Sequence, residues 1–151
     1  MRKIPNTPIS YSRKLPTWKN ILSKHAIYRH SYGNEMSNML KKYIMRKMKR
    51  HSYDHPLYRG LRRNKNIHNF NTKNTVKRNW FSSFSKNLTV ANSYTRNNKP
   101  RILVMNKPKN IKSLNYNNYK SEYPGEVEVL VAPGIFHVKR RNGKFIYVIK
   151  N

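Results

Sequence analysis

The sequence is poor in acidic residues, has few glycines and lacks cysteine, and each shortage excludes a kind of chemistry. Only 5 of the 151 residues are Asp or Glu, too few for a credible Ser-His-Asp hydrolase arrangement. Without Cys there can be no disulfide, thiol nucleophile or Cys-ligated zinc ion. None of the 5 Gly belongs to a Gly-rich phosphate loop, and no apolar run approaches the roughly 18 residues of a membrane span.

Positive charge is what the sequence has in abundance, because 33 Lys and Arg give a formal net charge of +28. One interpretation is functional, since such a field attracts nucleic acid, anionic membranes and acidic proteins. The other is compositional, since the basic residues are spread along an Asn- and Lys-rich chain and do not form one block. The sequence leaves both interpretations open.

The length fits one domain, and a hydrophobic fraction of 36% suffices for a small core. Residues 1–20 are basic, contain Pro5, Pro8 and Pro16, and lack periodicity. They predict a flexible arm ahead of a single catalytic domain at 21–151. Because this arm has no apolar segment of the secretory kind, we expect a soluble protein that acts inside a cell. We also expect the protein to be a monomer.

Apolar spacing predicts helices first and strands after them. A short helix is expected at 18–25 and a longer one at 34–50. The Met residues of the longer helix are assigned to core packing. One or two helical turns fit 88–95, and polar loops are expected at 62–79 and 106–120. Strands are expected at 57–61, 79–85, 101–105, 126–132, 135–138 and 145–149. Asn142-Gly143 predicts a hairpin between the last two strands, so the fold class is α+β with a mostly antiparallel sheet.

Three of the five acids lie within seven residues, at Glu122, Glu126 and Glu128. On a strand, Glu126 and Glu128 share a face and lie roughly 6–7 Å apart. Two such carboxylates suit two tasks, since one stabilises a developing cation and the other takes a proton from an incoming nucleophile. The alternative is a solubilising pair, but the surplus of Lys and Arg already solubilises the surface. No role is assigned to Glu122.

Two earlier segments contain residues suited to binding an anion. Arg59 follows Tyr58 on a short apolar strand, where its guanidinium can offer a donor fork to a phosphate. Gly60 comes next and permits close backbone approach. Ser83 and Ser85 alternate along a second strand and therefore share one of its faces.

In this order the segments resemble the arginine–serine–glutamate class of mono-ADP-ribosyltransferases, which includes clostridial toxins, vertebrate ecto-transferases and phage enzymes. LYRGL resembles the arginine motif of that class, and FSSFSKNLTVANSY resembles its Ser-Thr-Ser strand with the following helix. YPGEVEVLVAPGIFHV resembles its aromatic turn and Glu-x-Glu strand, and SYGNEMSNMLKKY its opening helix. The match spans about residues 28–149 and implies N-terminal helices followed by a two-sheet β-core.

The resemblance implies that NAD is the substrate and that no metal is needed. Arg59 would hold the NAD phosphates, and Gly60 would contact the nicotinamide amide through its backbone. Ser83 would hold Glu128, whose carboxylate would bond the ribose 2′-hydroxyl and stabilise the oxocarbenium as nicotinamide leaves. The remaining expected NAD contacts are Ser85 and Tyr94.

The resemblance also implies an acceptor side of the site. Glu126 would activate the acceptor, and Tyr123 lies in the turn that selects it. Glu at position 126 resembles the arginine-modifying members, so the expected acceptor is an arginine or another residue on a protein. Phe84 stands where Thr is commoner in the class, and an alternative register places Ser82 in the role of Ser83.

Two other functions remain open at this stage. The chain could be a basic nucleic-acid-binding protein with a degenerate transferase fold, in which aromatic rings among Lys and Arg stack on single-stranded bases. It could also be an NAD glycohydrolase, with water as the acceptor at the same site. A small enzyme without a signal peptide would suit a virus or phage acting in a host cell, and the charge would steer such an enzyme to nucleic acid or an acidic protein.

Overall fold

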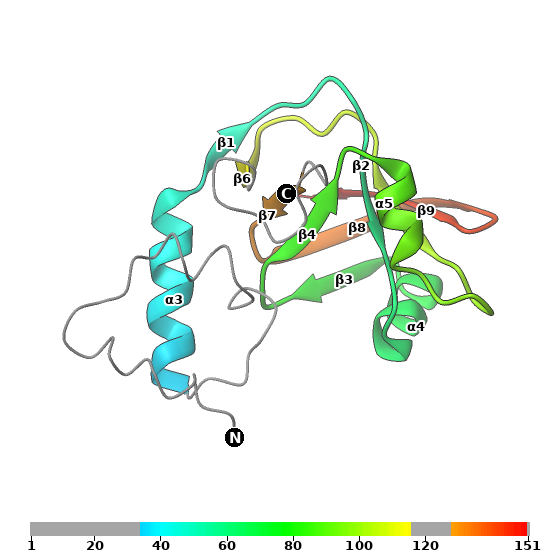
Figure 1. Ribbon diagram of the computed structural model, residues 1–151, viewed down its shortest axis with the longest axis horizontal. Helices are drawn as coiled ribbons and strands as arrows, with labels where there is room; N and C mark the ends of the chain where they lie inside the picture. The colour runs from blue at the N-terminus through cyan, green and yellow to red at the C-terminus, as the bar shows by residue number, and fades with distance from the viewer. Residues whose placement is uncertain (1–33, 116–127, 151) are drawn as a thin grey trace.

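The structure is a computed structural model that describes residues 34–115 and 128–150 (Figure 1). The expected helix after residue 33 is present as α3, and two shorter helices follow it. No helix in the described part of the chain is long and apolar enough to cross a membrane. The described helices are α3 (Asn34–Lys47), α4 (Asn64–Thr72) and α5 (Leu88–Ser93).

The described strands form one sheet in the order β1-β6-β7-β4-β2-β5-β9-β8-β3. Its neighbouring strands are antiparallel except β5 and β9, which run parallel. The strands are β1 (Lys49–His51), β2 (Leu57–Gly60), β3 (Thr75–Arg78), β4 (Ser82–Ser85), β5 (Ile102–Met105), β6 (Ile111–Asn115), β7 (Glu128–Val131), β8 (Gly134–Asn142) and β9 (Phe145–Lys150). The expected two-sheet core is thus one mixed sheet, because β5 pairs with both β2 and β9 and joins the halves.

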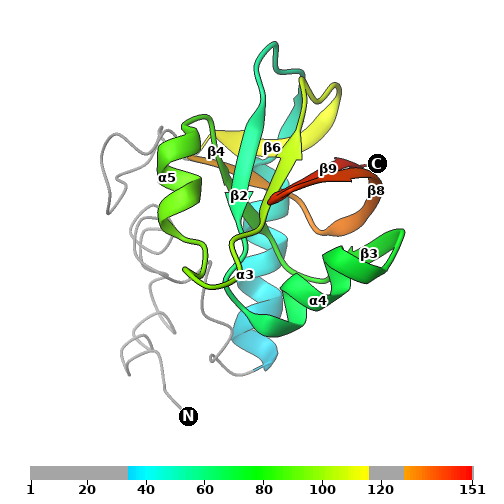
Figure 2. The same cartoon turned by 90° about the vertical axis from the view of Figure 1, so that its right-hand side faces the viewer.

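The sheet curls so that its two halves share one hydrophobic core (Figures 1 and 2). Phe84 of β4 stacks on Phe136 of β8, with ring centroids 6.1 Å apart, and Phe70 of α4 meets Phe136 edge-on. Val129 and Val131 of β7 are fully buried in the same cluster. The alternation of β7 therefore turns Glu128 to the opposite face of the sheet.

That opposite face carries a second, smaller cluster beneath α5. Ala91 of α5 packs with Ile102 and Val104 of β5, and all three are at most 4% exposed. Tyr58, Phe145 and Tyr147 surround them as partly buried neighbours. The short helix α5 thus closes the face of the sheet on which the polar residues of β4 and β7 lie.

Most of the expected elements are confirmed, at slightly different boundaries. The strands at LYRGL, FSSFS, RILVM and EVLV are present, and so are the α5 helix and the hairpin around Asn142-Gly143, where Gly143 has φ 61°. The helix from Asn34 ends at Lys47 and not at Arg50, because residues 49–51 pair with β6.

Three other expectations are wrong. Residues 62–79, expected to be a loop, contain α4 and β3. Ile67 and Phe70 are buried about one helical turn apart on α4, and Val76 of β3 is buried in the same core. Residues 106–120 include β6, which pairs with β7 on one side and β1 on the other. Met48 is buried as assigned, but Met39 is 45% exposed and is not a core residue. The arm at 1–20 and the helix at 18–25 lie outside the described residues.

Candidate active site

Strands β4 and β7 bring Ser83 and Glu128 together. The two strands pair antiparallel, with Ser85 opposite Glu128 and Ser83 opposite Leu130. The Ser83 Oγ donates a hydrogen bond to Glu128 Oε2 across the strand pair. Glu128 is only 3% exposed, so its carboxylate is held away from bulk water. A carboxylate in that position interacts strongly with any positive charge that develops beside it.

Arg59 of β2 is tied to the same pair. Its Nη1 donates to the Ser83 carbonyl oxygen at 3.0 Å, across 24 residues of sequence. The contact depends on the sheet order, because β4 lies between β2 and β7. Arg59, Ser83 and Glu128, which the sequence placed in three separate motifs, thus form one connected chain of hydrogen bonds.

The alternative register with Ser82 is not supported by the geometry. Ser82 and Phe84 share one face of β4 by strand alternation, and Phe84 is 1% exposed in the main core. Ser83 lies on the other face, with Glu128. The structure therefore brings Ser83, and not Ser82, to the candidate site.

Ser85 and Asn87 fix the start of α5 next to the site. The Ser85 Oγ accepts a hydrogen bond from the Asn87 backbone N–H at 2.9 Å. Asn87 Oδ1 in turn accepts from the Thr89 N–H at 2.9 Å, which caps the helix. Sequence analysis missed Asn87, although an Asn directly before the helical segment LTVANS is a recognised N-cap signal.

Gly60 lets α5 pack directly on β2. A Cβ atom at position 60 would lie 2.1 Å from the Ala91 carbonyl oxygen, far inside van der Waals contact. The expected close backbone approach at Gly60 is therefore present, but the group that approaches Gly60 within this chain is the backbone of α5. At the far end of the same helix, Tyr94 is 41% exposed.

An open polar hollow of about 600 Å³ lies beyond the C-terminal end of α5. Thr95, which lines the hollow, also lies 3.2 Å from the Cβ position of Gly60, so the hollow begins next to β2. Arg62 and Arg96 contribute two cations to its wall. Sequence analysis missed both arginines, because nothing distinguishes them from the many others in this chain.

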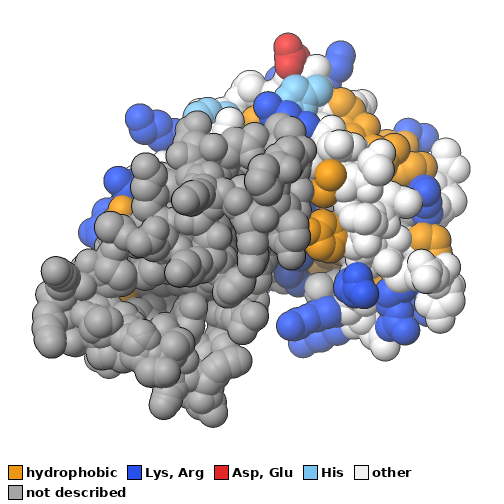
Figure 3. Space-filling view, in the orientation of Figure 1, with side chains coloured by type: hydrophobic (Ala, Val, Ile, Leu, Met, Phe, Trp, Pro, Cys, Tyr) orange, Lys and Arg blue, Asp and Glu red, His pale blue; other side chains and the backbone are white. Residues whose placement is uncertain are grey.

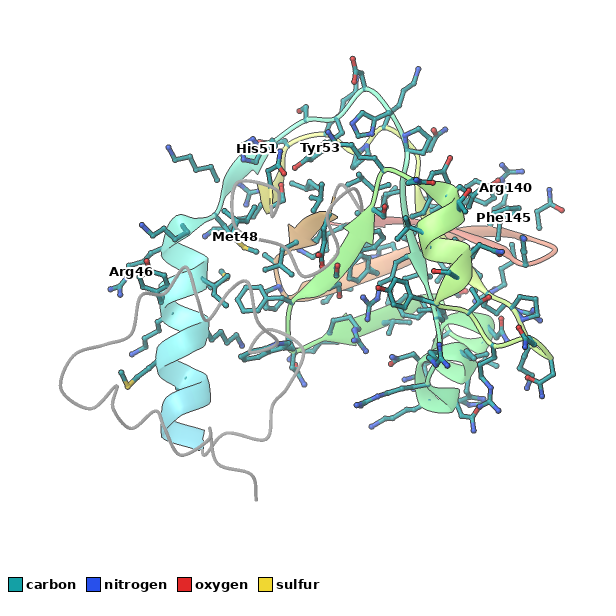
Figure 4. The ribbon with its side chains drawn as sticks, in the orientation of Figure 1. Arg46, Met48, His51, Tyr53, Arg140 and Phe145 are labelled. Atoms are coloured by element: carbon teal, nitrogen blue, oxygen red, sulfur yellow. The ribbon has the colours of Figure 1, made fainter. Side chains whose placement is uncertain are left out.

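Glu126 and Tyr123 lie outside the described residues, so their expected roles stay predictions. Within the described ranges, no group of three or more His, Asp or Glu side chains is placed to hold a metal ion. His51 and His55 each lie beside the Tyr53 ring, with centroids 6.2 and 5.7 Å from it. Figure 4 shows Tyr53 and His51 at the β1 edge of the molecule.

No protein-family model and no curated protein matches the sequence. Solved structures do match the fold. The ADP-ribosyltransferase Vis, in complex with an inhibitor, superposes with a TM-score of 0.60 at 19% identity, over 93% of this chain and 74% of its own. Vis has also been solved with agmatine, and that structure matches with a TM-score of 0.51 at 15% identity, over 93% of this chain and 69% of its own.

Two C3 enzymes also match. C3stau2 from S. aureus, solved with NAD, has a TM-score of 0.58 at 15% identity, over 94% of this chain and 90% of its own. The C3 exoenzyme of Clostridium limosum has a TM-score of 0.55 at 16% identity, over 94% and 82%. The nine-stranded mixed sheet of the described residues therefore belongs to a shared architecture: the chain has the fold of the ADP-ribosyltransferases of the toxin class.

Proposed function

We propose that the protein is an NAD-dependent mono-ADP-ribosyltransferase, a glycosyltransferase that moves ADP-ribose to an acceptor and releases nicotinamide. The observation that carries the proposal is the chain of hydrogen bonds from Arg59 through Ser83 to the buried carboxylate of Glu128. It lies in an ADP-ribosyltransferase fold, on the strands where the sequence motifs predicted it.

The reaction needs an anion beside a growing cation. When the bond between the ribose C1′ and the nicotinamide nitrogen breaks, its electron pair leaves with nicotinamide and the ribose becomes an oxocarbenium ion. The Glu128 carboxylate stabilises that ion, and its burial strengthens the interaction because little water screens it. Ser83 contributes by holding the carboxylate in one orientation.

NAD is proposed to bind along α5 and β2. Gly60, Ser83, Ser85 and Glu128 surround the nicotinamide end and Arg59 binds the NAD phosphates beside it, in keeping with C3stau2, which was solved with NAD. The rest of the dinucleotide extends past Tyr94 towards the hollow at the end of α5. Its two arginines suit a pyrophosphate, because guanidinium groups donate paired hydrogen bonds to phosphate oxygens.

The proposed acceptor is an arginine side chain of a protein, in which Glu126 removes the proton from the attacking nitrogen and Tyr123 helps to select the target. The Glu-x-Glu motif supports this choice. So does the structure of Vis with agmatine, since agmatine carries the same guanidinium group as arginine. The high positive charge further suggests an acceptor that is acidic or associated with nucleic acid.

The decisive experiment is incubation with radiolabelled NAD and whole-cell lysate, with and without nuclease. The proposal expects covalent label on protein, resistant to boiling in denaturant and absent with Glu128→Gln. Label that disappears on nuclease treatment of the finished reaction would place the acceptor on nucleic acid. NAD cleavage without label transfer would indicate a glycohydrolase, and no NAD cleavage at all would contradict the proposed function.

A further inference from the structure

The sheet face that carries Ser83 and Glu128 extends beneath α5 to the β8–β9 hairpin. Residues paired across neighbouring strands project to the same face of a sheet. Following the register from β7 to β8 therefore gives one row of side chains on one face. In strand order the row is Glu128, Ser85, Tyr58, Val104, Tyr147 and Arg140.

The far end of this face combines aromatic rings with cations. The Arg140 guanidinium lies 4.2 Å from the Tyr147 ring centroid, and Lys144 Nζ lies 5.5 Å from the Phe145 centroid. The two rings are themselves neighbours, with centroids 6.5 Å apart. We call these four residues the hairpin platform. Its turn segment, KRRNGK at 139–144, has four cations and no acid.

The platform is held in place by the rest of the molecule. Phe145 and Tyr147 pack against the cluster of Ala91 and Ile102 under α5. Lys144 Nζ donates to Asn92 Oδ1 of α5 at 3.1 Å, and Figure 4 shows Arg140 and Phe145 where the hairpin passes this helix. On the opposite face, Arg141 donates to the carbonyl oxygens of Phe70 and Lys73, at 3.0 and 2.8 Å. Binding there would order few side chains, so little conformational entropy would be lost.

We propose that the hairpin platform binds single-stranded nucleic acid. Unpaired bases stack on aromatic side chains and on guanidinium planes, while Lys and Arg neutralise the phosphates between them. In the platform each ring has a cation beside it, since Arg140 lies 4.2 Å from the Tyr147 ring centroid and Lys144 lies 5.5 Å from that of Phe145. An acidic peptide fits the platform less well, because the negative face of an aromatic ring repels a carboxylate.

The position of the platform relative to the candidate site suggests what nucleic-acid binding there would do. Five steps between neighbouring strands, each of about 4.8 Å, separate Arg140 from Glu128 along the sheet, or about 24 Å in all. A nucleic-acid strand bound at the platform would hold itself, or a protein attached to it, at about that distance from the candidate site, on the other side of α5. This positioning role rests on the proposed transferase function, but the binding itself does not.

The test measures fluorescence anisotropy of a labelled 16-nucleotide oligo-dT, without NAD. One variant combines Arg140→Gln with Lys144→Gln, and a second combines Phe145→Leu with Tyr147→Leu to keep apolar bulk while removing the rings. The matched control, Lys65→Gln with Lys77→Gln, removes two exposed cations from α4 and β3. Thermal melts of each variant check that it is folded.

We expect each platform variant to raise the Kd about tenfold and the control to change it less than twofold. The platform charge variant should also flatten the slope of log Kd against log salt by about 1.4, because each neutralised phosphate of a single strand contributes about 0.7 to that slope. Equal effects of platform and control variants, or equally tight binding of a duplex or of polyglutamate, would overturn the proposal. If NAD cleavage is absent while the binding results hold, the transferase proposal fails and the binding surface stands.

Discussion

At the scale of single residues, the buried carboxylate of Glu128 is the feature that most needs a reason. A charged group that is 3% exposed loses most of its hydration, which costs free energy unless partners replace the water. Here the Ser83 hydroxyl donates a hydrogen bond to the carboxylate, and the other three residues of β7 are apolar and buried. A chain with only five acids that buries one of them pays for it in stability, which is typical of a catalytic group.

Replacing Glu128 by Gln should separate chemistry from folding. Gln keeps the shape of the side chain and its contact with Ser83, but it cannot stabilise a cation. We expect NAD turnover to fall about 100- to 1,000-fold, with a melting temperature at or above that of the wild type. The control is Asp54→Asn, which removes an exposed carboxylate. Equal turnover in Glu128→Gln and the wild type would show that this carboxylate is not catalytic.

Ser83 and Ser82 provide a test of register at neighbouring positions. Ser83→Ala removes the hydroxyl that holds Glu128, and we expect about tenfold slower NAD turnover and a loss of about 1.5–3 kcal/mol in the free energy of unfolding. Ser82→Ala alters a buried hydroxyl on the core face and should leave turnover within twofold of wild type. Steady-state kinetics of NAD turnover distinguishes the two registers. A larger loss of turnover in Ser82→Ala than in Ser83→Ala would mean that the assigned register is wrong.

At the scale of elements, sequence reasoning found those with strong local patterns and missed those that depend on the fold. The apolar runs of β5 and β7 and the Asn142-Gly143 turn can each be recognised from a short stretch of sequence. By contrast, α4 has only Ile67 and Phe70 as buried residues among nine, and β6 interrupts its apolar residues with Lys112 and Ser113. Such segments take their structure from the core they join, which no local window reveals.

The connection between the motif residues was equally beyond the sequence. Strand order decides that Arg59 reaches the Ser83 carbonyl, and that order follows from long-range pairing. The motifs predicted which residues should form the site, because their types suit the chemistry, and the structure brings Arg59, Ser83 and Glu128 together. They could not predict that Ser85 anchors the N-terminal cap of α5, since that role depends on how tightly the chain turns after β4.

The packing of α5 on β2 leads to a prediction about Gly60. In Gly60→Ala the new methyl group would collide with the Ala91 carbonyl, so α5 must shift. We expect a loss of about 1–3 kcal/mol in stability by chemical denaturation, together with reduced NAD turnover.

The control for Gly60→Ala is Gly143→Ala at the hairpin turn. It strains a residue with φ 61° but meets no atom within 4 Å, so it should lower stability by about 1–2 kcal/mol without affecting turnover. If both variants lose turnover in proportion to stability, the position of α5 has no special importance for the site.

A second prediction at this scale concerns Tyr53, which connects the segment after β1 to β6. Its hydroxyl shares a 2.8 Å hydrogen bond with Ser113, a residue with no exposed surface. Burial raises the pKa of Tyr53 above its ordinary value of 10.0, and the bond to Ser113 offsets this only in part. The folded protein therefore favours the neutral phenol more than the unfolded chain does.

The pH dependence follows from that difference. Below pH 10 the contribution of Tyr53 is complete, and above it the unfolded chain ionises first, so the contribution is lost as pH rises through the pKa of the folded state. Tyr53→Phe should lose about 1 kcal/mol at pH 8 by urea denaturation, and the gap to wild type should narrow above pH 10. Tyr147→Phe, in the other cluster, is the control. A gap that is constant across this range would contradict the assignment.

At the scale of the whole molecule, the charge acts as one field. The acids of the described ranges are Glu35, Asp54 and Glu128, and the last is buried, so cations dominate the surface. Figure 3 shows Lys and Arg side chains in groups around the described part of this face, with acidic atoms visible only at its upper edge. Such a surface repels itself and attracts anions over distances that salt controls, since the Debye length is about 8 Å at physiological ionic strength.

The final prediction uses salt to separate steering from chemistry. The rate of NAD cleavage depends on contacts inside the site, so at saturating NAD it should change less than twofold between 50 and 300 mM salt. Modification of an anionic target depends on encounter, so we expect its rate to fall at least about tenfold over the same range. Measuring both in one reaction, at saturating NAD, gives cleavage as an internal control. If target modification keeps pace with cleavage at every salt concentration, the +28 charge reflects composition and not recruitment of the substrate.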